Sequence, residues 1–494
     1  MGSGNPVAIS PHPNPLLEGE GTRSLLDCSY LTHLRPISPD MASAVRFSNL
    51  AIVRASSGKR LWLAAAGIAI FIATVWTVHA LVSRHETREP GFGLDFIAFY
   101  TAGTFTREGR LGDLYNLEAV HQFQRELATA NHFDLGRAYG PWWNPPFYAL
   151  VFEPLALLPY WTASAVWIGF NLFCFALACV LLCRLLPEKS PRHVRALIPV
   201  LTILSAPFIL AISHAQNTCT SLLLLTLTVT LWRSRRAFLA GLVGGLMFYK
   251  PQVAAVLAIV LAIDLGWRAI AGYAITGAAL LALNLIALPG TLTDYLQRLP
   301  RNVHSFQTGT AYPWEQHVTL KAFWRLLLQG HSLGNTTKAV TILSSISALA
   351  IALLLLAAAV RTRAATRSSE PPQITSSRRD RLIAATIVVT PLLMPFYFDY
   401  DLLLLSVPAV LFAAGRTCCA QDRLPSADRW IVGAWAILYV WQMVNADFGG
   451  KFHVNLSVLV LTGLASMLVV RVGRTRAATA SDSDVVAVPA RRAA

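Results

Sequence analysis

The stretches GLDFIAFYTAG, Gly93 to Gly103, and YGPWWNPPF, Tyr139 to Phe147, lie near the two ends of the first long polar segment of the chain. This segment, residues 83–145, follows the apolar run Trp62 to Val82, which has the length of about 20 residues that a helix needs to cross a bilayer. Asp95 therefore lies a few residues beyond the end of a predicted membrane helix. Because most of the chain lies in lipid, a carboxylate at this place is expected to have a structural or functional role.

The composition indicates an all-α polytopic membrane protein. Of its 494 residues, 54% are hydrophobic and only 14% are charged, whereas about 25% are charged in a soluble globular chain. The net charge of +15 comes from Lys and Arg residues that cluster at the ends of apolar runs, where they act as orientation signals. No basic, aromatic-bearing soluble module is present, so the composition excludes nucleic acid as a partner.

Successive apolar runs predict about ten to twelve transmembrane helices. Placing both termini in the cytoplasm puts every strongly basic loop on the inside. Two large outer loops then result, residues 83–145 and 290–336. The runs after the first are Trp161–Leu182, Leu197–Ile212, Thr218–Trp232, Ala237–Tyr249, Val253–Leu265, Ile270–Leu288, Ala339–Val360, Leu382–Met394, Leu402–Ala414, Trp430–Val444 and Val454–Val470.

The termini do not show the pattern of folded domains. Residues 1–60 are predicted to be a cytoplasmic N-terminal segment, and residues 1–40 of it lack apolar periodicity, so we expect the natural start at Met41. Residues 61–472 form the predicted membrane catalytic domain. Residues 473–494, rich in Ala, Ser and Asp, are predicted to be a disordered cytoplasmic tail.

Local signals predict three irregular features inside the membrane domain. Apolar residues from Leu114 to Leu127 recur at helical spacing, so an amphipathic helix with Asn116 as its N-cap is expected in the first outer loop. The run Phe147 to Leu158 is too short to span and is expected to be re-entrant or interfacial. Pro251 breaks the helical pattern directly after Lys250, so two short arms are expected to meet at a cavity-lining apex.

The polar residues at the ends of the predicted helices collect on the outer side. This distribution predicts a polar cavity that opens outward from the bundle, because ionisable residues in a membrane are costly and usually functional. The residues concerned are Asp95, Tyr100, Asn144, His214, Gln216, Asn217, Lys250, Gln252, His317, Asp399, Tyr400 and Asp401.

Each of these residues also has a simpler explanation. Asp95 is equally well placed to be the N-cap of the following helix or a general base. Lys250 can extend to lipid headgroups, and Asp399 and Asp401 can be turn residues. His317 fits an ordinary loop histidine. The Gln-Asn pair fits a turn or a helix cap.

Taken together and in this order, the motifs resemble glycosyltransferase family 87, the bacterial membrane mannosyltransferase-like proteins of the GT-C fold. The resemblance covers roughly residues 60–470. One departure is Ala215 in SHAQN, where glycine is more usual before the Gln. The motifs are D-F-x-x-[FY]-Y-x-A-G at Asp95–Gly103, GDLY at Gly112–Tyr115, PPF at Pro145–Phe147, EPLALLP at Glu153–Pro159, QN at Gln216–Asn217, KPQ at Lys250–Gln252 and YD at Tyr400–Asp401.

The resemblance implies an inverting glycosyltransferase with the GT-C fold in the bacterial inner membrane. It implies transfer of a hexose, of mannose type, from a polyprenyl-phosphate-sugar donor to a glycolipid or glycan acceptor on the outer, periplasmic face. The acidic residue of the first outer loop is the base in such enzymes, and here it is Asp95. Lys250 and His317 are expected to bind the donor phosphate. The expected cavity lining comprises Tyr100, Asn144, Gln216, Asn217, Gln252, Asp399, Tyr400 and Asp401.

No cofactor is expected, and the metal requirement stays open. No DxD-type metal motif is apparent apart from Asp399 and Asp401, which are separated by Tyr400. The main alternative function is a transporter or flippase of lipid-linked saccharides, which would also enclose a polar cavity between helices. A transporter favours internal repeats and charges in the middle of helices, and neither is evident in this sequence.

Overall fold

The computed structural model describes residues 93, 95–136, 139–367, 372–417 and 426–473. Every described residue belongs to one compact unit, which lies within Gly67–Ala494. The predicted start at Met41, the predicted span Trp62–Val82 and the predicted disordered tail lie outside the described residues. Within the described ranges the chain is helical, and its only strand-like pairing is an isolated bridge between His317 and Phe398.

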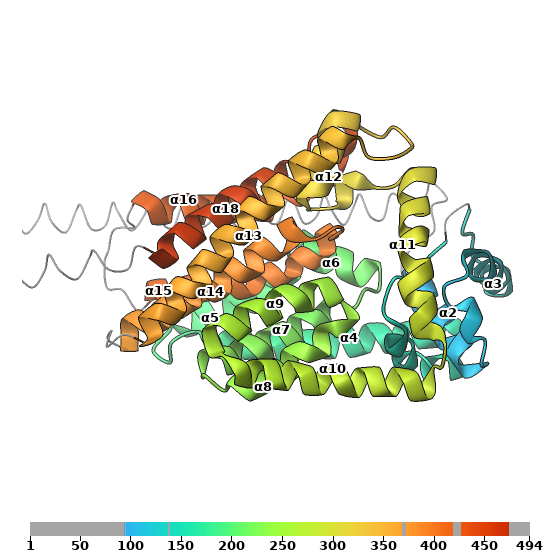
Figure 1. Ribbon diagram of the computed structural model, residues 1–494, viewed down its shortest axis with the longest axis horizontal. Coiled ribbons are helices and arrows are strands. Elements are labelled where there is room, and N and C mark those ends of the chain that lie inside the picture. Colours follow the sequence, from blue (N-terminus) through green and yellow to red (C-terminus); the bar gives the residue numbers. More distant parts are fainter. Residues whose placement is uncertain (1–92, 94, 137–138, 368–371, 418–425, 474–494) are drawn as a thin grey trace, which may run out of the picture. The chain divides into compact units, whose positions relative to one another are not determined.

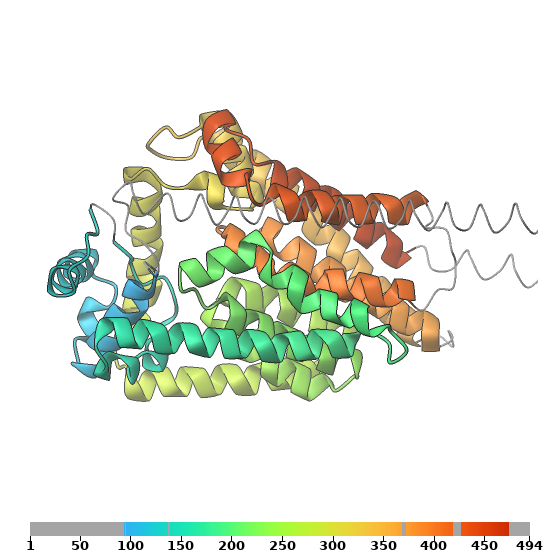
Figure 2. The same cartoon turned by 180° about the vertical axis from the view of Figure 1, so that it is seen from behind.

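A bundle of helices forms the main body of the described residues (Figures 1 and 2). Helix α4 packs on α7, α7 on α8, and α8 on α9 and α10, while α13, α14 and α18 pack on one another and α14 also contacts α15. The bounds are Tyr160–Leu185 for α4, Thr218–Arg233 for α7, Ala237–Gly245 for α8, Pro251–Leu265 for α9, Trp267–Ala287 for α10, Lys338–Arg367 for α13, Pro372–Leu393 for α14, Ser406–Thr417 for α15, Ser426–Trp441 for α16 and Leu456–Gly473 for α18.

Apolar helices of membrane-crossing length make this an all-α polytopic membrane protein. Helices α4, α10 and α13 are long and apolar enough to cross a bilayer. Two bent pairs raise that count to five among the described residues: α5 (Arg192–Ile203) with α6 (Ala206–Ser213), and α17 (Asn445–Phe452) with α18. The predicted count of about ten to twelve stays a prediction, because several expected arms are short. Helix α9, for example, has 15 residues and rises about 22 Å.

Close helix packing explains a glycine in the middle of α8. A Cβ atom added at Gly241 would lie 2.0 Å from the carbonyl oxygen of Ala269 in α10. Small residues let two backbones approach in this way, which is the usual means of holding membrane helices together without a hydrophobic driving force. The pair α8 and α10 therefore forms a tightly packed edge of the bundle.

A set of short and amphipathic helices gathers at the end of the bundle where α4, α7 and α9 begin, which we call the α2 end (Figures 1 and 2). The opposite end, where these three helices finish, is called the arginine end. The elements at the α2 end are α2 (Phe96–Arg107), η2 (Leu111–Asp113), α3 (Leu117–Ala130), η3 (Pro146–Val151), η4 (Leu155–Leu157), α11 (Thr291–Gly309), η6 (Trp314–Gln316) and α12 (Leu320–Gln329).

The structure confirms several local predictions. Asn116 caps α3, since its side chain accepts hydrogen bonds from the backbone N–H groups of Glu118 and Ala119 at 3.2 and 3.4 Å. The run after Pro145 forms the short 3-10 helices η3 and η4 and does not span. The helix breaks between η5 (Leu246–Tyr249) and α9, as the Lys-Pro sequence predicts.

Two predicted loops are in fact largely helical. The second polar segment, residues 290–336, contains the 19-residue helix α11, which the polar sequence and Pro300 concealed. The basic stretch 361–381 consists mainly of the end of α13 and the beginning of α14. Its arginines therefore continue helices rather than form a loop.

Candidate active site

Several polar side chains at the α2 end form a cluster around the turn between α6 and α7. Ala215 adopts a left-handed conformation with φ of 51°, and its carbonyl oxygen accepts a hydrogen bond of 2.8 Å from Nε1 of Trp167. A residue with a Cβ atom pays about 1–2 kcal/mol for this conformation, and this is the position where the family resemblance leads one to expect glycine. The turn directs His214 and Gln216 toward the same carboxylate.

That carboxylate belongs to Asp95. Its Oδ2 accepts a hydrogen bond of 2.6 Å from Nε2 of Gln216 and lies 3.5 Å from Nδ1 of His214. The backbone of the same segment is fixed by a 2.7 Å hydrogen bond from the N–H of Gly93 to the carbonyl of Ser213. Two segments that are 121 positions apart in the chain therefore meet at one oxygen atom.

Asp95 occupies the N-cap position of α2 without capping it. Its side chain accepts no hydrogen bond from the first N–H groups of the helix, so the simpler explanation given above does not account for this carboxylate. About 39% of the side chain is exposed, which leaves room for a second molecule to reach it. The carboxylate is thus held from one side and accessible from another.

The surroundings of Asp95 keep the carboxylate ionised. Burial alone would raise its pKa, but the hydrogen bond and electrostatic interaction with His214, together with the hydrogen bond of Gln216, lower it further than burial raises it. The net pKa lies below the ordinary value of 3.8. The carboxylate is therefore an anion at neutral pH, which is the protonation state that accepting a proton requires.

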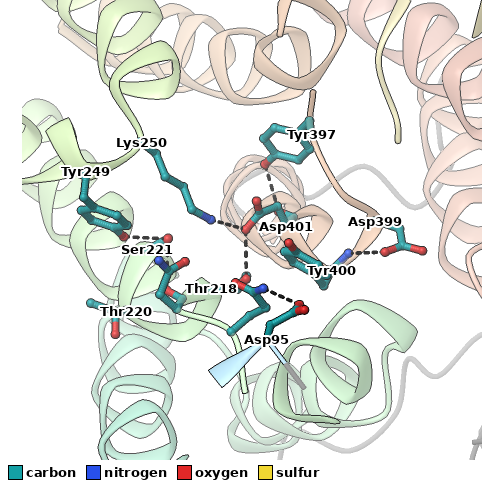
Figure 3. Close-up of polar contacts among 12 residues, drawn as sticks. Asp95, Thr218, Thr220, Ser221, Tyr249, Lys250, Tyr397, Asp399, Tyr400 and Asp401 are labelled. Carbon is teal, nitrogen blue, oxygen red and sulfur yellow. Dashed lines mark hydrogen bonds and ion pairs between the residues drawn. The ribbon is translucent and has the colours of Figure 1, made fainter. Parts of the chain in front are cut away.

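A second carboxylate, that of Asp401, pairs with a cation nearby. Nζ of Lys250 lies 2.6 Å from Oδ1 of Asp401, and the hydroxyl of Thr218 donates to the same oxygen at 2.9 Å (Figure 3). The hydroxyl of Tyr397 donates to the backbone carbonyl of Asp401. The helix break places Lys250 there, because Pro251 fits the first position of α9, where no N–H is required.

The two carboxylates are linked through the start of α7. Gln216 contacts Asp95, and Thr218, two residues later, contacts Asp401. Figure 3 shows both carboxylates in one cluster, with Lys250 above Asp401 and the turn below it. The structure thus brings together predicted residues from four distant parts of the sequence.

Asp399 and Tyr400 lie beside this cluster. Burial raises the pKa of Asp399 to about 6, and its carboxylate accepts a hydrogen bond from the backbone N–H of Tyr400. The carboxylates of Asp399 and Asp401 point in different directions (Figure 3). Within the described ranges, no three side chains of His, Cys, Asp or Glu gather as metal ligands would.

The surroundings of His317 disfavour the positive charge expected of a phosphate ligand. Its ring is almost fully buried, stacks on Tyr312 at 4.9 Å and lies 4.1 Å from Phe398. Burial, with a smaller effect of the Lys321 ammonium, lowers its pKa to about 3. Its Nδ1 accepts a hydrogen bond from the N–H of Tyr397. A neutral imidazole of this kind can donate only from Nε2.

Other predicted cavity residues hold the surrounding structure. The hydroxyl of Tyr100 donates to the carbonyl of Leu158 at 2.9 Å and so ties α2 to the residue after η4. Asn217 is buried and donates to the hydroxyl of Tyr148 at 3.2 Å. These contacts place both side chains in the walls of the cluster.

The remaining predicted lining residues lie farther along the same walls. The backbone carbonyl of Asn144 accepts a hydrogen bond of 2.7 Å from the hydroxyl of Tyr115. Gln252 lies half-buried in the first turn of α9. A close approach also explains the glycine that ends the Asp95 motif: a Cβ atom at Gly103 would lie 2.3 Å from the carbonyl oxygen of Phe152.

Sequence reasoning missed Thr218 and Tyr397. Both lie next to recognised motifs, but a threonine that starts an apolar helix and a tyrosine in an aromatic turn give no separate signal. His214 was recognised as polar and outward, and its position two residues before Gln216 marks it as part of the same turn. The alternation of His214, Gln216 and Thr218 is the signal that was available.

The turn, Lys250 and His317 all lie in a segment of the chain that matches a known protein family. Residues 142–377 match the model of glycosyltransferase family 87. Over this span, which is just under half of the chain, the sequence has the pattern of glycosyltransferase family 87. No curated protein and no solved structure matches the chain. The protein is therefore a glycosyltransferase, with a sugar donor and an acceptor as its substrates.

The family match begins after Asp95 and ends before Asp399 and Asp401. Roles for these three carboxylates in the glycosyltransferase thus depend on the contacts described above. The geometry that joins Asp95 to Gln216 and Asp401 to Lys250 connects them to the matched segment.

Proposed function

We propose that this glycosyltransferase moves a hexosyl group, mannosyl in the first instance, from a polyprenyl-phosphate donor to a hydroxyl of a glycolipid or glycan acceptor. The reaction inverts the anomeric centre, and Asp95 is the general base. The cluster lies at the outer face of the bacterial inner membrane, with both chain termini in the cytoplasm. Basic residues at the opposite end of the bundle support this orientation.

One observation carries the proposal. Asp95 lies at the start of a helix but leaves the helix uncapped, and its carboxylate is held by Gln216 and His214 while a large part of it stays exposed. A carboxylate that serves only the fold would satisfy the N–H groups beside it. This arrangement supports a general base whose carboxylate is oriented by Gln216 and His214 and whose exposed part can accept a proton from an acceptor hydroxyl.

The proposed step is a single displacement. The acceptor hydroxyl gives its proton to the carboxylate of Asp95 as its oxygen attacks the anomeric carbon of the donor sugar. The bond between that carbon and the phosphate oxygen breaks, and both electrons leave with the polyprenyl phosphate. The acceptor oxygen takes the place of the phosphate oxygen at the anomeric carbon, the proton ends on Asp95 and the negative charge on the released phosphate, so atoms and charge balance.

Lys250 is proposed to stabilise the charge that develops on the departing phosphate. Its ammonium carries three protons, and Asp401 accepts only one of them at 2.6 Å. Asp401 holds the ammonium in place at the break before α9, which leaves its other protons for a phosphate oxygen. His317, neutral and buried, is proposed as a donor of a neutral hydrogen bond rather than as a cation.

The test is transfer of radiolabelled sugar by membranes or by purified protein in lipid nanodiscs. Polyprenyl-phosphate-mannose is the donor, and the native protein is compared with Asp95→Asn. We expect transfer to fall about 10²–10⁴-fold, the usual contribution of a general base. Asp134→Asn, an exposed turn residue in the same segment, is the matched control and should keep full activity.

Unfolding curves of each variant separate lost chemistry from lost structure. Full transfer by a folded Asp95→Asn protein contradicts the assignment of the base. Translocation of a lipid-linked saccharide without any new glycosidic bond would instead support the flippase alternative. Transfer from polyprenyl-phosphate-glucose or polyprenyl-phosphate-arabinose in preference to the mannose donor would overturn only the choice of sugar.

A further inference from the structure

A row of aromatic rings starts in the first polar segment and crosses to α11. The ring centroids of Tyr139 and Trp143 lie 5.7 and 5.6 Å from that of Phe306, with their planes nearly perpendicular to it. Phe306 in turn lies 6.4 Å from Tyr312. Three separate stretches of chain therefore contribute to one continuous set of rings.

The row continues to the catalytic cluster. Tyr312 stacks on His317 at 4.9 Å, His317 lies 4.1 Å from Phe398, and Phe398 stacks on Tyr400 at 5.1 Å. Tyr400 lies 6.1 Å from His214, the imidazole that contacts Asp95. No step in this path exceeds the 7 Å within which aromatic pairs interact.

Within the row His317 and Tyr400 are buried, whereas the other rings differ from an ordinary aromatic core in their exposure. Tyr139, Trp143, Phe306, Tyr312 and Phe398 are only half-buried. Nearby, Phe96, Phe99, Trp142 and Phe152 form a separate aromatic cluster that is almost completely buried. The buried cluster explains how the α2 end is held together, and the half-buried row is left with open ring surface.

We propose that this aromatic row binds the acceptor, and that the acceptor is a saccharide of at least two sugar units. The proposal rests on the proposed function and deepens it by naming how the acceptor is held. The C–H groups on one face of a pyranose are apolar and match the face of an aromatic ring, whose quadrupole is negative there. The terminal sugar lies at His214, beside Asp95, and the preceding sugars lie along the half-buried rings from Phe398 to Phe306 and Trp143.

Two features favour a saccharide over the lipid chain of the donor. The row runs through polar segments and amphipathic helices, outside the long apolar helices α4, α10 and α13 that can contact a polyprenyl chain. It also contains an unpaired polar atom, because Nε2 of His317 makes no hydrogen bond to any described residue. A sugar hydroxyl at this point would satisfy a donor that is otherwise costly to bury.

The test uses Phe306→Leu and Trp143→Leu, which keep an apolar side chain but remove the ring face. The acceptor probes are linear trisaccharides of mannose, glucose and N-acetylglucosamine, with octyl mannoside as a single-sugar probe. For the trisaccharide that serves as acceptor, we expect KM to rise about threefold to tenfold, which corresponds to the loss of one aromatic contact. Donor KM and the KM for octyl mannoside should stay unchanged.

Control variants distinguish binding from packing. Phe306→Tyr keeps the ring and should restore the native KM, whereas a packing defect would not depend on aromaticity. Phe173→Leu, at an exposed position of α4, is the matched control and should leave every parameter unchanged. A donor KM that rises together with the acceptor KM would contradict the proposal, as would unchanged acceptor KM in both leucine variants.

A binding measurement keeps this test independent of the reaction. Quenching of tryptophan fluorescence by the same trisaccharides is measured in the Asp95→Asn protein without donor, so that no transfer takes place. Saturable quenching that weakens in Phe306→Leu supports the row even if the proposed base is wrong. Absence of saturable binding by all three trisaccharides would contradict saccharide binding by the aromatic row. The role of Asp95 is tested separately.

Discussion

The two ends of the bundle each contain a carboxylate paired with a cation, and they differ in how fully the pair is enclosed. At the arginine end, Oδ2 of Asp264 lies 2.8 Å from Nε of Arg379, and their side chains are 0% and 5% exposed. At the α2 end, Lys250 and Asp401 are 13% and 10% exposed. The same charges therefore occur in a sealed pair and in a pair at the edge of the open cluster.

The partners around each pair explain the difference. Asp264 also accepts a 2.7 Å hydrogen bond from Nε1 of Trp232, and its backbone carbonyl accepts one from Arg363. These contacts tie α9 to α7, α13 and α14, so the sealed pair holds four helices together. The Lys250–Asp401 pair instead joins the break before α9 to η7 (Asp399–Leu405) and lies beside the exposed carboxylate of Asp95. One pair holds helices together, and the other is the pair that we propose to serve the donor phosphate.

The largest expected effect comes from breaking the sealed pair. Arg379→Met leaves the carboxylate of Asp264 buried without its cation, and we expect a loss of about 3–5 kcal/mol in unfolding free energy. Denaturant unfolding in detergent micelles measures this loss. Sugar transfer per folded molecule should stay near the native value, because Arg379 is at the end of the bundle opposite the cluster.

The double variant Asp264→Asn with Arg379→Met provides the control for that prediction. Removing both charges should recover most of the lost stability, since the cost comes from an unpaired buried charge rather than from the lost pair. A single variant as stable as the native protein would show that the pair does not hold the helices together. A double variant no more stable than the single one would show that packing, not charge, accounts for the loss.

An intermediate effect is expected at the open pair. Lys250→Ala should raise the donor KM about tenfold to a hundredfold, because a charge-assisted hydrogen bond to phosphate contributes about 1.5–3 kcal/mol. The loss of stability should be smaller than at the arginine end, because the Thr218 hydroxyl still donates to Asp401. Donor KM and unfolding free energy, measured on the same preparation, distinguish the two effects.

Lys338→Ala, at the exposed start of α13, is the matched control for Lys250→Ala and should change neither quantity. If Lys250→Ala leaves the donor KM unchanged, contact between the ammonium and the donor phosphate is ruled out. If instead it destabilises the protein as much as Arg379→Met does, the distinction between a fold pair and a substrate pair disappears.

Local signals in the sequence were sufficient for much of the fold. The cap at Asn116, the helix break at Pro251 and the long apolar helix α4 follow from side-chain chemistry within a few residues of each position. The helix α11 did not, because a polar amphipathic helix with an internal proline resembles a loop when only apolar runs are counted. Its packing against the rest of the α2 end overrides that local preference.

Contacts between residues that are far apart in the sequence could not be predicted from these local signals. The arginines near residue 379 were interpreted as orientation signals, yet Arg379 is buried against Asp264, 115 positions away. Asp95 was predicted to be important, but nothing in the sequence could show that its carboxylate leaves its own helix for Gln216. Such pairs depend on which helix ends meet, and that is decided by packing rather than by neighbours in the sequence.

The smallest expected effect is a shift in pH dependence that only the open end should show. His214 contributes to lowering the pKa of Asp95, whereas burial raises it. In His214→Gln the raising effect of burial remains and the two contributions of His214 are lost, so the pKa of Asp95 should rise. Because the base must be deprotonated, the acid limb of kcat/KM should move to higher pH.

Asp399, whose pKa is about 6, also titrates nearby, so the comparison is repeated in an Asp399→Asn background. If the acid limb moves only when Asp399 is present, the limb reports the titration of Asp399. If the limb does not move at all, His214 does not influence the pKa of the proposed base.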